Sequence, residues 1–294
     1  IINGAECEPY LNGDHLTMLN HPEELMKGIK LLAIASGLEG ASYGIEKNKA
    51  DAIKLLREKG AASFGIDIVE EDVKYPQGGE KMQVKAVTNR EVPPGGIPSS
   101  VGCNVVSTRT AYAVYEACYL GKPCIERIVT FAGSALKAPV NALTRVGTPF
   151  DYIVEQCGGF VKECRKIVLG GPMMGICATG LEAPTVKGTA GVLFFTEEEE
   201  VKAEDPQCIH CGKCIRVCPM HLSPVYMYKY YRLGNLDKLQ ENHVNDCFEC
   251  GSCSYNCPAH LPLTHSFKTS KLALADRAQK EKQKAEQAAK EANK

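Results

Sequence analysis

Two cysteine runs with the same spacing lie in the C-terminal third of the 294-residue chain. Each run reads C-x2-C-x2-C-x3-C and is followed directly by a proline. Three thiolates in a short loop can bind three irons of a cubane, and the fourth iron needs a cysteine from elsewhere in the chain. The pattern therefore predicts two [4Fe–4S] clusters. The first run is Cys208, Cys211, Cys214 and Cys218, and the second is Cys247, Cys250, Cys253 and Cys257.

The same spacing is found in bacterial two-cluster ferredoxins, where the fourth cysteine of each run ligates the other cluster. We therefore predict two crossed ligand sets, which hold the clusters close together and suit the transfer of single electrons. The set predicted for cluster 1 is Cys208, Cys211, Cys214 and Cys257. The set predicted for cluster 2 is Cys247, Cys250, Cys253 and Cys218.

Other uses of these cysteines fit the pattern less well. Structural zinc takes four ligands, commonly as two separated pairs, and does not account for three equal steps, a following proline and a repeat. A disulfide framework is disfavoured because the total of 15 cysteines is odd. The cysteines outside the runs are interpreted as small core residues of a protein in a reducing cytoplasm. They are Cys7, Cys103, Cys118, Cys124, Cys157, Cys164 and Cys177.

Composition limits the partners of the chain. Hydrophobic residues make up 44% and charged residues 23%, a balance that supports globular cores. The net charge of −1 implies no general attraction to nucleic acid, so no nucleic-acid partner is expected. No apolar stretch approaches the length of a membrane span. A role at a membrane would therefore come through a partner.

The patterns of helix and strand predict a multi-domain fold of α/β plus α+β class. Residues 1–121 alternate strand and helix signals and predict a Rossmann-like domain. Because Ile1-Ile2-Asn3-Gly4 reads as the end of a strand, we expect the N-terminal part of that domain to be missing. Residues 122–195 combine several strands with a short helix and predict a small domain of the β-grasp kind.

The remaining residues predict a linker, a cluster domain and a tail. The run Glu197 to Glu200 marks residues 196–206 as a solvated acidic linker. Residues 207–267 are predicted to form a mostly helical domain with two clusters. Between the runs, a helix after Ser223-Pro224 carries an apolar face that we expect to pack near the clusters: Tyr226, Met227, Tyr230, Tyr231 and Leu233. Residues 268–294, rich in Ala, Lys and Glu, predict either a solvated helix or a disordered tail.

Three segments outside the runs carry a family resemblance. Asn3 to Tyr10 resembles the N-x-x-E-x-E-P segment of the flavin-bearing, NADH-oxidising subunit of respiratory complex I. Lys74 to Lys81 resembles the second flavin-site stretch of that family. Val140 to Gly159 is similar to a soluble-ligand-binding β-grasp domain. The order of these modules, followed by the two cysteine runs, resembles the C subunit of the Rnf electron-transport complex.

This resemblance implies a function and a location. It implies a peripheral subunit of an ion-translocating ferredoxin:NAD+ oxidoreductase that moves electrons between NAD(H), FMN and two [4Fe–4S] clusters. A flavin connects a two-electron carrier with one-electron carriers, so the combination is chemically coherent. The implied place is the cytoplasmic side of the plasma membrane. The implied partners are integral and peripheral subunits of the complex, with ferredoxin reached through a sister subunit.

The resemblance also implies FMN-site residues, while the chemistry itself belongs to the cofactors and no catalytic residue is assigned. In the first segment, the matching residues are Asn3, Glu6 and Glu8, with Glu8 placed where the family meets NADH. Ala5 stands where the complex I relative has an acid, which removes one polar contact.

The second segment matches at Gly78, Gly79, Glu80 and Lys81. A later flavin-site segment of that family matches at Ser107, or at Asn104 if the alignment is shifted. The glycine-rich phosphate loop of the family lies upstream of these segments. The resemblance therefore implies that this chain alone binds FMN weakly or not at all.

Two rival hypotheses remain open at the level of sequence. A soluble cobalamin reductase of the microcompartment type has a similar order of modules and passes electrons to a corrin. A ferredoxin-like docking module would use the N-terminal half as a scaffold without flavin. Flavin absorption separates the second rival from the others, and co-purification with membrane subunits separates the first.

Overall fold

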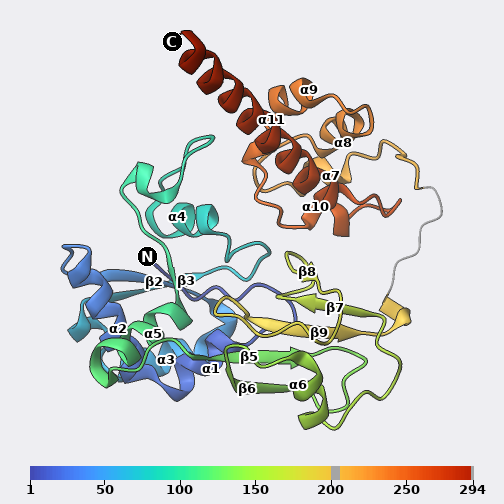
Figure 1. Cartoon of the computed structure of the whole chain (residues 1–294). Coiled ribbons are helices and arrows are strands. Elements are labelled where there is room, and N and C mark those ends of the chain that lie inside the picture. Colours follow the sequence, from blue (N-terminus) through green and yellow to red (C-terminus); the bar gives the residue numbers. More distant parts are fainter. Residues whose placement is uncertain (200–205, 293–294) are drawn as a thin grey trace. The chain divides into compact units, whose positions relative to one another are not determined.

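The computed structural model describes residues 1–199 and 206–292 of the chain. The chain divides into two compact units, Ile1–Glu200 and Val201–Lys294, and each is described by itself (Figure 1). Most of the predicted acidic linker, residues 200–205, lies outside the described residues. Its first residues form the 3-10 turn Glu197–Glu199, where the Glu199 carboxylate accepts a hydrogen bond from the Thr196 N–H at 3.0 Å.

The first unit begins with a four-stranded sheet in which all strands are parallel, in the order β3-β2-β1-β4. From β1 the chain moves through β2 to β3 and then returns to place β4 on the other side of β1. Such a reversal opens a crevice beyond the carboxyl ends of the strands, where doubly wound sheets bind ligands. The strands are β1 (Ile2–Asn3), β2 (Ala41–Glu46), β3 (Ile66–Glu71) and β4 (Val106–Ser107).

Four helices build an apolar core against one face of this sheet (Figure 1). Apolar side chains at helical spacing, such as Leu25 and Ile29, face the sheet and are buried. Alternate residues of β2, Tyr43 and Ile45, point into the same core. The helices are α1 (Gly13–Asn20), α2 (Pro22–Ala35), α3 (Ala50–Glu58) and α5 (Thr108–Leu120).

A fifth helix, α4 (Glu80–Thr88), packs near β2 and covers polar side chains. Gly44 and Glu46 alternate with the core residues of β2 and so face the other side of the sheet. Gln83 of α4 is fully buried on that side. The sheet therefore has an apolar core on one face and buried polar side chains on the other.

A second sheet follows in the same unit, with the order β6-β5-β9-β7-β8. Its central pair, β5 and β9, is parallel, and the other pairs are antiparallel. Helix α6 (Phe150–Gln156) packs on this sheet, and Phe150 shares a buried core with Phe131 and Phe194. A mixed sheet with one helix agrees with the expected α+β class. The strands are β5 (Glu126–Ala132), β6 (Val140–Arg145), β7 (Lys166–Leu169), β8 (Ile176–Cys177) and β9 (Gly191–Phe195).

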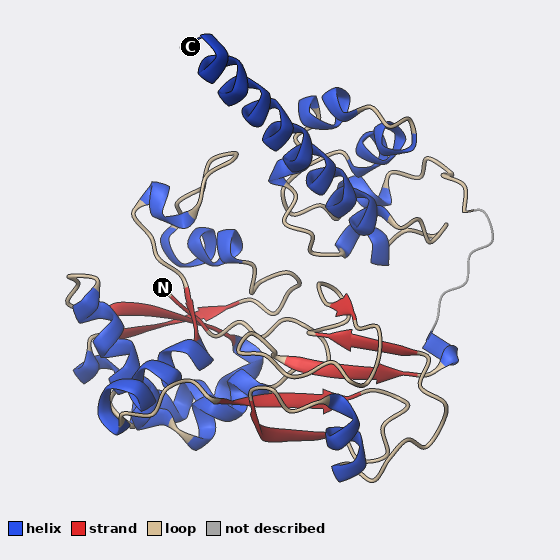
Figure 2. Cartoon of the chain, viewed as in Figure 1, coloured by secondary structure: helices blue, strands red, loops and turns tan. Residues whose placement is uncertain are grey.

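The second unit consists of helices and loops over its described residues, 206–292 (Figure 2). Met227, Leu239 and Phe267 form its apolar core together with cysteines of the two runs. The Ala/Lys/Glu segment continues as helix as far as Ala292, so the helical alternative holds for the described part of the tail. The helices are α7 (Lys213–Arg216), α8 (Pro224–Arg232), α9 (Leu236–Glu241), α10 (Ser252–Tyr255) and α11 (Leu263–Ala292). No helix in the described ranges is both long enough and apolar enough to cross a bilayer.

One expectation about packing holds only in part, and a second is wrong. On α8, Met227 is buried as expected, but Tyr226 is 53% exposed and Leu233, just beyond the helix, is 66% exposed. Only one side of this short helix packs against the core, and Tyr228 is buried there beside Met227. The seven cysteines outside the runs, all of them in the described part, are also not core residues as a group. Only Cys157 is buried, whereas Cys118 near the end of α5 and Cys177 on the edge strand β8 are exposed.

Candidate functional site

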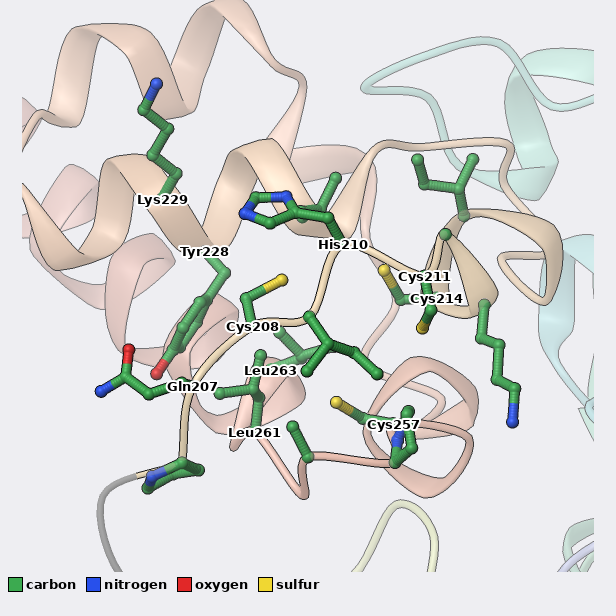
Figure 3. A pocket seen from close by; sticks show the side chains of 18 of the residues that line it. Gln207, Cys208, His210, Cys211, Cys214, Tyr228, Lys229, Cys257, Leu261 and Leu263 are labelled. Carbon is green, nitrogen blue, oxygen red and sulfur yellow. The ribbon is translucent and has the colours of Figure 1, made fainter.

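Four thiols from both cysteine runs surround one cavity in the second unit (Figure 3). Cys208, Cys211 and Cys214 come from the first run, and Cys257 comes from the end of the second. The cavity has a volume of about 650 Å³. The structure thus brings together the four residues predicted for cluster 1.

The other four thiols line a second and much narrower cavity, of about 20 Å³. Cys247, Cys250 and Cys253 come from the second run, and Cys218 comes from the end of the first. All four line the same small cavity, which places the four thiols near one another. These are the residues predicted for cluster 2, and a cubane here would push the surrounding side chains outward.

The same local fold occurs in both runs. The residue before the second cysteine has a positive φ, 53° at His210 and 62° at Glu249. The glycine after that cysteine is also left-handed, with φ of 72° at Gly212 and 82° at Gly251. One helical turn follows in each run, α7 in the first and α10 in the second. The repeated spacing therefore folds as a repeated loop that turns its thiols inward.

Burial raises the pKa of four of these thiols, those of Cys214, Cys218, Cys247 and Cys253. It raises the pKa of Cys247 to about 11 and that of Cys253 to about 12. Backbone N–H groups offset this in part, because Glu249 donates to Cys247 Sγ and Leu222 donates to Cys218 Sγ, each at 3.4 Å. Thiols with raised pKa values are protonated at neutral pH, so iron must displace their protons. Four thiols in each set is the donor chemistry of a [4Fe–4S] cluster, and the residues fit that group.

The two cluster sites differ in their access to solvent. Cys211 in the open cavity is exposed, whereas Cys250 and Cys253 in the narrow cavity are each 8% exposed. Phe267 and Met227 close the narrow cavity. A cluster held by the first set would lie at the surface of this unit, and one held by the second would be enclosed.

The residues predicted to contact FMN gather at the carboxyl edge of the parallel sheet. Asn3 at the end of β1 is the register partner of Ser107 at the end of β4, so both lie at the point where the strand order reverses. The Asn3 Nδ2 group donates to the Gly78 carbonyl at 2.9 Å. The segments that contain Asn3, Gly78 and Ser107 therefore meet at this edge.

Gly78 fits there only because it has no side chain. A Cβ atom on Gly78 would lie 2.3 Å from the Ala5 carbonyl oxygen. The Gly78 N–H donates to Cys7 Sγ at 3.3 Å, which ties the second segment to the first again. This close approach of two backbone segments at the edge requires glycine at this position. It is the observation on which the fit of the edge to FMN rests.

Glu6 is held by helix α1. Its two carboxylate oxygens accept hydrogen bonds from the Asp14 N–H at 3.0 Å and the His15 N–H at 3.1 Å, in the first turn of the helix. Burial, reinforced by the charge of Asp14, raises the pKa of Glu6. The carboxylate therefore supplies the helix start with the acceptor that Asn12 does not provide.

Glu8 joins the two sheets of the first unit. Its carboxylate accepts from the Met173 N–H at 3.1 Å and the Met174 N–H at 2.9 Å, in the loop after β7. A Cβ atom on Gly171 would lie 2.1 Å from Glu8 Oε2, so the loop fits closely over this side chain. Burial raises the pKa of Glu8. Both acids of the first segment thus have backbone partners in the protein.

The remaining predicted residues lie at helix starts. Gly79 precedes α4, Glu80 begins it and is exposed, and Lys81 follows as a half-buried residue. Ser107 precedes α5, and its hydroxyl oxygen accepts from the Thr110 N–H at 3.3 Å. Asn104 is exposed and lies before β4.

Sequence reasoning missed a set of buried polar residues beside this edge. Glu46 and Glu71 end β2 and β3, and Gln83 lies on α4. All three are buried, and each has one side-chain oxygen without a hydrogen-bond partner. The sequence showed only that a glutamate stands at the end of each of these two strands. That signal is ordinary for a strand end and does not reveal burial.

Comparison with known proteins defines the class. Residues 1–116 match the Nuo51 FMN-binding domain, residues 128–176 match the SLBB domain, and residues 200–258 match the 4Fe-4S dicluster domain. The matches thus define a chain that combines a flavin-type domain, an SLBB domain and an iron–sulfur domain. FMN and paired [4Fe–4S] clusters, the expected cofactors, are those of the matched domain families.

The relatives are more specific. The chain is 40% identical over 246 residues to the C subunit of the Na(+)-translocating ferredoxin:NAD(+) oxidoreductase complex of Acetobacterium woodii, covering 84% of this chain and 56% of that one. It is 41% identical over 241 residues to the C subunit of the proton-translocating complex of Clostridium ljungdahlii, covering 82% and 52%. The resemblance to the C subunit of the Rnf complex is confirmed, and the chain spans about half the length of these relatives.

Solved structures agree on the fold. The chain is similar to an NAD+-reducing [NiFe]-hydrogenase in the H2-reduced state, with a TM-score of 0.59 and 17% identity. The match covers 92% of this chain and 56% of that chain. At this identity, the likeness concerns the fold alone.

A double substitution tests the crossed ligand sets. Cys208→Ala combined with Cys257→Ala removes two ligands of one site if the sets are crossed, so the chain should keep about four of about eight irons. If each run instead held its own cluster, both clusters would lose a ligand and most of the iron would be lost. Iron and sulfide are measured on anaerobic protein, and Cys118→Ala with Cys177→Ala is the matched control.

A second prediction concerns the close approach at Gly78. Gly78→Ala should lower the free energy of unfolding of the first unit by roughly 1–3 kcal/mol, because the new Cβ overlaps the Ala5 carbonyl. Denaturant unfolding followed by circular dichroism measures the change. Gly188→Ala is the control, since a Cβ there meets no atom within 4 Å. Equal stability of the two variants would contradict this packing.

Proposed function

We propose that this chain is the part of a peripheral subunit that exchanges electrons between NAD(H), FMN and two [4Fe–4S] clusters, within an ion-translocating ferredoxin:NAD+ oxidoreductase. The observation that carries this proposal is the convergence of eight thiols on two cavities, each set drawn from both runs. The relatives named as C subunits of ferredoxin:NAD(+) oxidoreductase complexes support it. We place it on the cytoplasmic side of the membrane through its partner subunits.

The sheet edge is the proposed site of FMN. When bound, FMN exchanges electron pairs with a nicotinamide and single electrons with iron–sulfur clusters. Asn3 and Ser107 would bind its polar groups where the strand order reverses. Helices α4 and α5 both begin at this edge, at Glu80 and Thr108, and their N-terminal dipoles favour the negative charge of a phosphate or a reduced ring.

The acids of the first segment contribute mainly through position. Glu6 fixes the start of α1, and Glu8 fixes the loop of the second sheet over the edge. Glu8 is only half-buried by its neighbours, so it remains the residue proposed to meet NAD(H). Glu80 and Lys81, in the first turn of α4, are proposed to border the ring system.

The open cluster site is the proposed contact for a redox partner. Its lining includes Lys213, Lys229 and Arg232, and none of the described residues that line it is a carboxylate. Ile209 is 65% exposed and Tyr226 is 53% exposed beside it. An apolar centre with a basic surround suits a one-electron carrier protein with an acidic face. The enclosed cluster would then pass electrons within the chain.

The deciding experiment uses the full-length protein. Anaerobic purification should yield flavin together with two clusters, and NADH should bleach both the flavin and the iron–sulfur absorption. Clusters without flavin would favour the docking module. Flavin with clusters but without integral membrane subunits on co-purification would favour a soluble reductase, and both results would overturn the proposal.

A charge reversal tests the docking face. Lys213→Glu with Lys229→Glu should slow reduction of the clusters by an acidic reduced ferredoxin about tenfold or more at low salt, because steering is lost. The difference should shrink as salt rises. Stopped-flow absorbance measures the rates. Lys280→Glu, an exposed change on α11, is the control, and equal slowing by that control would argue against a local docking face.

A further inference from the structure

The polar face of the first sheet buries two acids side by side. Glu46 on β2 and Glu71 on β3 are register partners, so their side chains emerge on the same face. Their exposed fractions are 2% and 4%. Gln83 from α4 lies over them and is fully buried. Neither sequence patterns nor the proposed electron transfer accounts for this group.

The hydrogen bonds of the group leave two unpaired oxygens beside Gly44. Gln83 Nε2 donates to Glu71 Oε2 at 2.6 Å and to the Gln77 carbonyl at 3.2 Å, which uses both amide hydrogens. Among the described residues, Glu71 Oε1 and Gln83 Oε1 have no hydrogen-bond partner. Both oxygens lie beside Gly44, at 2.5 and 2.6 Å from the position that a Cβ would take there. Two unpaired acceptors in one buried space are costly unless a proton lies between them.

We propose that Glu71 is protonated at neutral pH and that its neutral carboxyl forms a cyclic pair with the Gln83 amide through two hydrogen bonds. The first bond is Gln83 Nε2–H to Glu71 Oε2, which the structure contains. The second is Glu71 Oε1–H to Gln83 Oε1. A single proton thereby satisfies the unpaired oxygens of Glu71 and Gln83, while Glu46 Oε2 is outside the ring. It belongs to Glu71 rather than Glu46 because the amide of Gln83 is joined to Glu71.

The surrounding charges agree with this assignment. Burial is the main cause that raises the pKa of Glu71, opposed by hydrogen bonds from Gln83 and Gln77 and by the charge of Lys74. Burial also raises the pKa of Glu46, and the neighbouring Glu71 adds to this. Lys49 and the Lys74 N–H favour the charged form of Glu46. One carboxylate charge thus has cationic and N–H support, and the proton removes the other charge.

The pair also has a position in the fold that gives it a role. It joins β3 to α4, and the chain between them contains Gln77 and Gly78. Gly78 is the residue that meets Asn3 and Ala5 at the sheet edge. Glu71 is therefore a positioning residue for this segment, and its proton holds the segment in place. This inference does not depend on bound flavin.

The test compares the stability of Glu71→Gln and the wild type as a function of pH. The pKa of Glu71 is raised on folding, so its stabilising contribution is complete below the unfolded pKa and declines as pH rises toward the folded pKa. Glu71→Gln keeps the two-bond ring as a pair of amides without needing a proton. Its folding constant should therefore gain on that of the wild type by up to about tenfold per pH unit in that range. Denaturant unfolding of the anaerobic chain from about pH 5 to about pH 9 measures this.

Two variants and one spectrum complete the experiment. Gln83→Leu should destabilise the chain at every pH, and Asp67→Asn, an exposed change on β3, should leave the pH profile unchanged. Infrared spectra of the wild type should show a protonated carboxyl at neutral pH that Glu71→Gln removes. If Glu71→Gln fails to fold, the wild-type spectrum still overturns the proposal when it shows no protonated carboxyl, and loss of that band in Gln83→Leu supports it.

The proposal is overturned if no protonated carboxyl is seen at neutral pH. It is also overturned if the ratio of the two folding constants does not change with pH. A third contrary result is stability that depends on added sodium, magnesium or calcium, because the oxygens would then bind a cation instead of a proton.

Discussion

The crossing of the two cysteine runs is the constraint on which the second unit depends. Neither run supplies four thiols to one cavity, so each cavity closes only when both runs are in place. The segment between the runs, α8 and α9, must then return the chain to the first loop, and it does so by burying Met227 and Leu239 against α11. Cluster ligation and the apolar core therefore depend on each other, as is usual for small metal domains.

The constraint on the first unit is different and lies at the carboxyl edge of its parallel sheet. Backbone N–H groups donate hydrogen bonds to both acids of the first segment. Glu6 accepts from the first turn of α1, and Glu8 accepts from the loop after β7. Gly78 packs against the Ala5 carbonyl at this edge, where a Cβ atom would not fit. The Asn3 side chain joins both residues, since it donates to the Gly78 carbonyl and accepts from the Ala5 N–H. Helices α4 and α5 begin at the same edge.

Local patterns predicted what local chemistry determines. The first three cysteines of each run lie within seven residues, so their spacing was sufficient to expect three thiols in one loop. The crossing of the fourth cysteines was expected because two-cluster ferredoxins have the same spacing. The alternation of strand and helix in residues 1–121, and several strands with one short helix in residues 122–195, followed from apolar patterns, whereas α1 and α9 were not predicted. The sequence did not reveal that Asn3 bonds to Gly78, or that Glu8 reaches Met173, since these pairs are far apart along the chain. The pairing of Glu71 with Gln83 depends on register and helix placement, which no local pattern encodes.

Electron paramagnetic resonance of the chemically reduced, anaerobic protein tests the central claim most directly. Two clusters held by crossed ligands lie close together, so the account predicts a signal broadened by interaction between two reduced [4Fe–4S] centres. Partial reduction should give a simpler signal from one centre. A fully reduced sample with a single isolated centre, with two centres that do not interact, or with zinc in place of iron would contradict it.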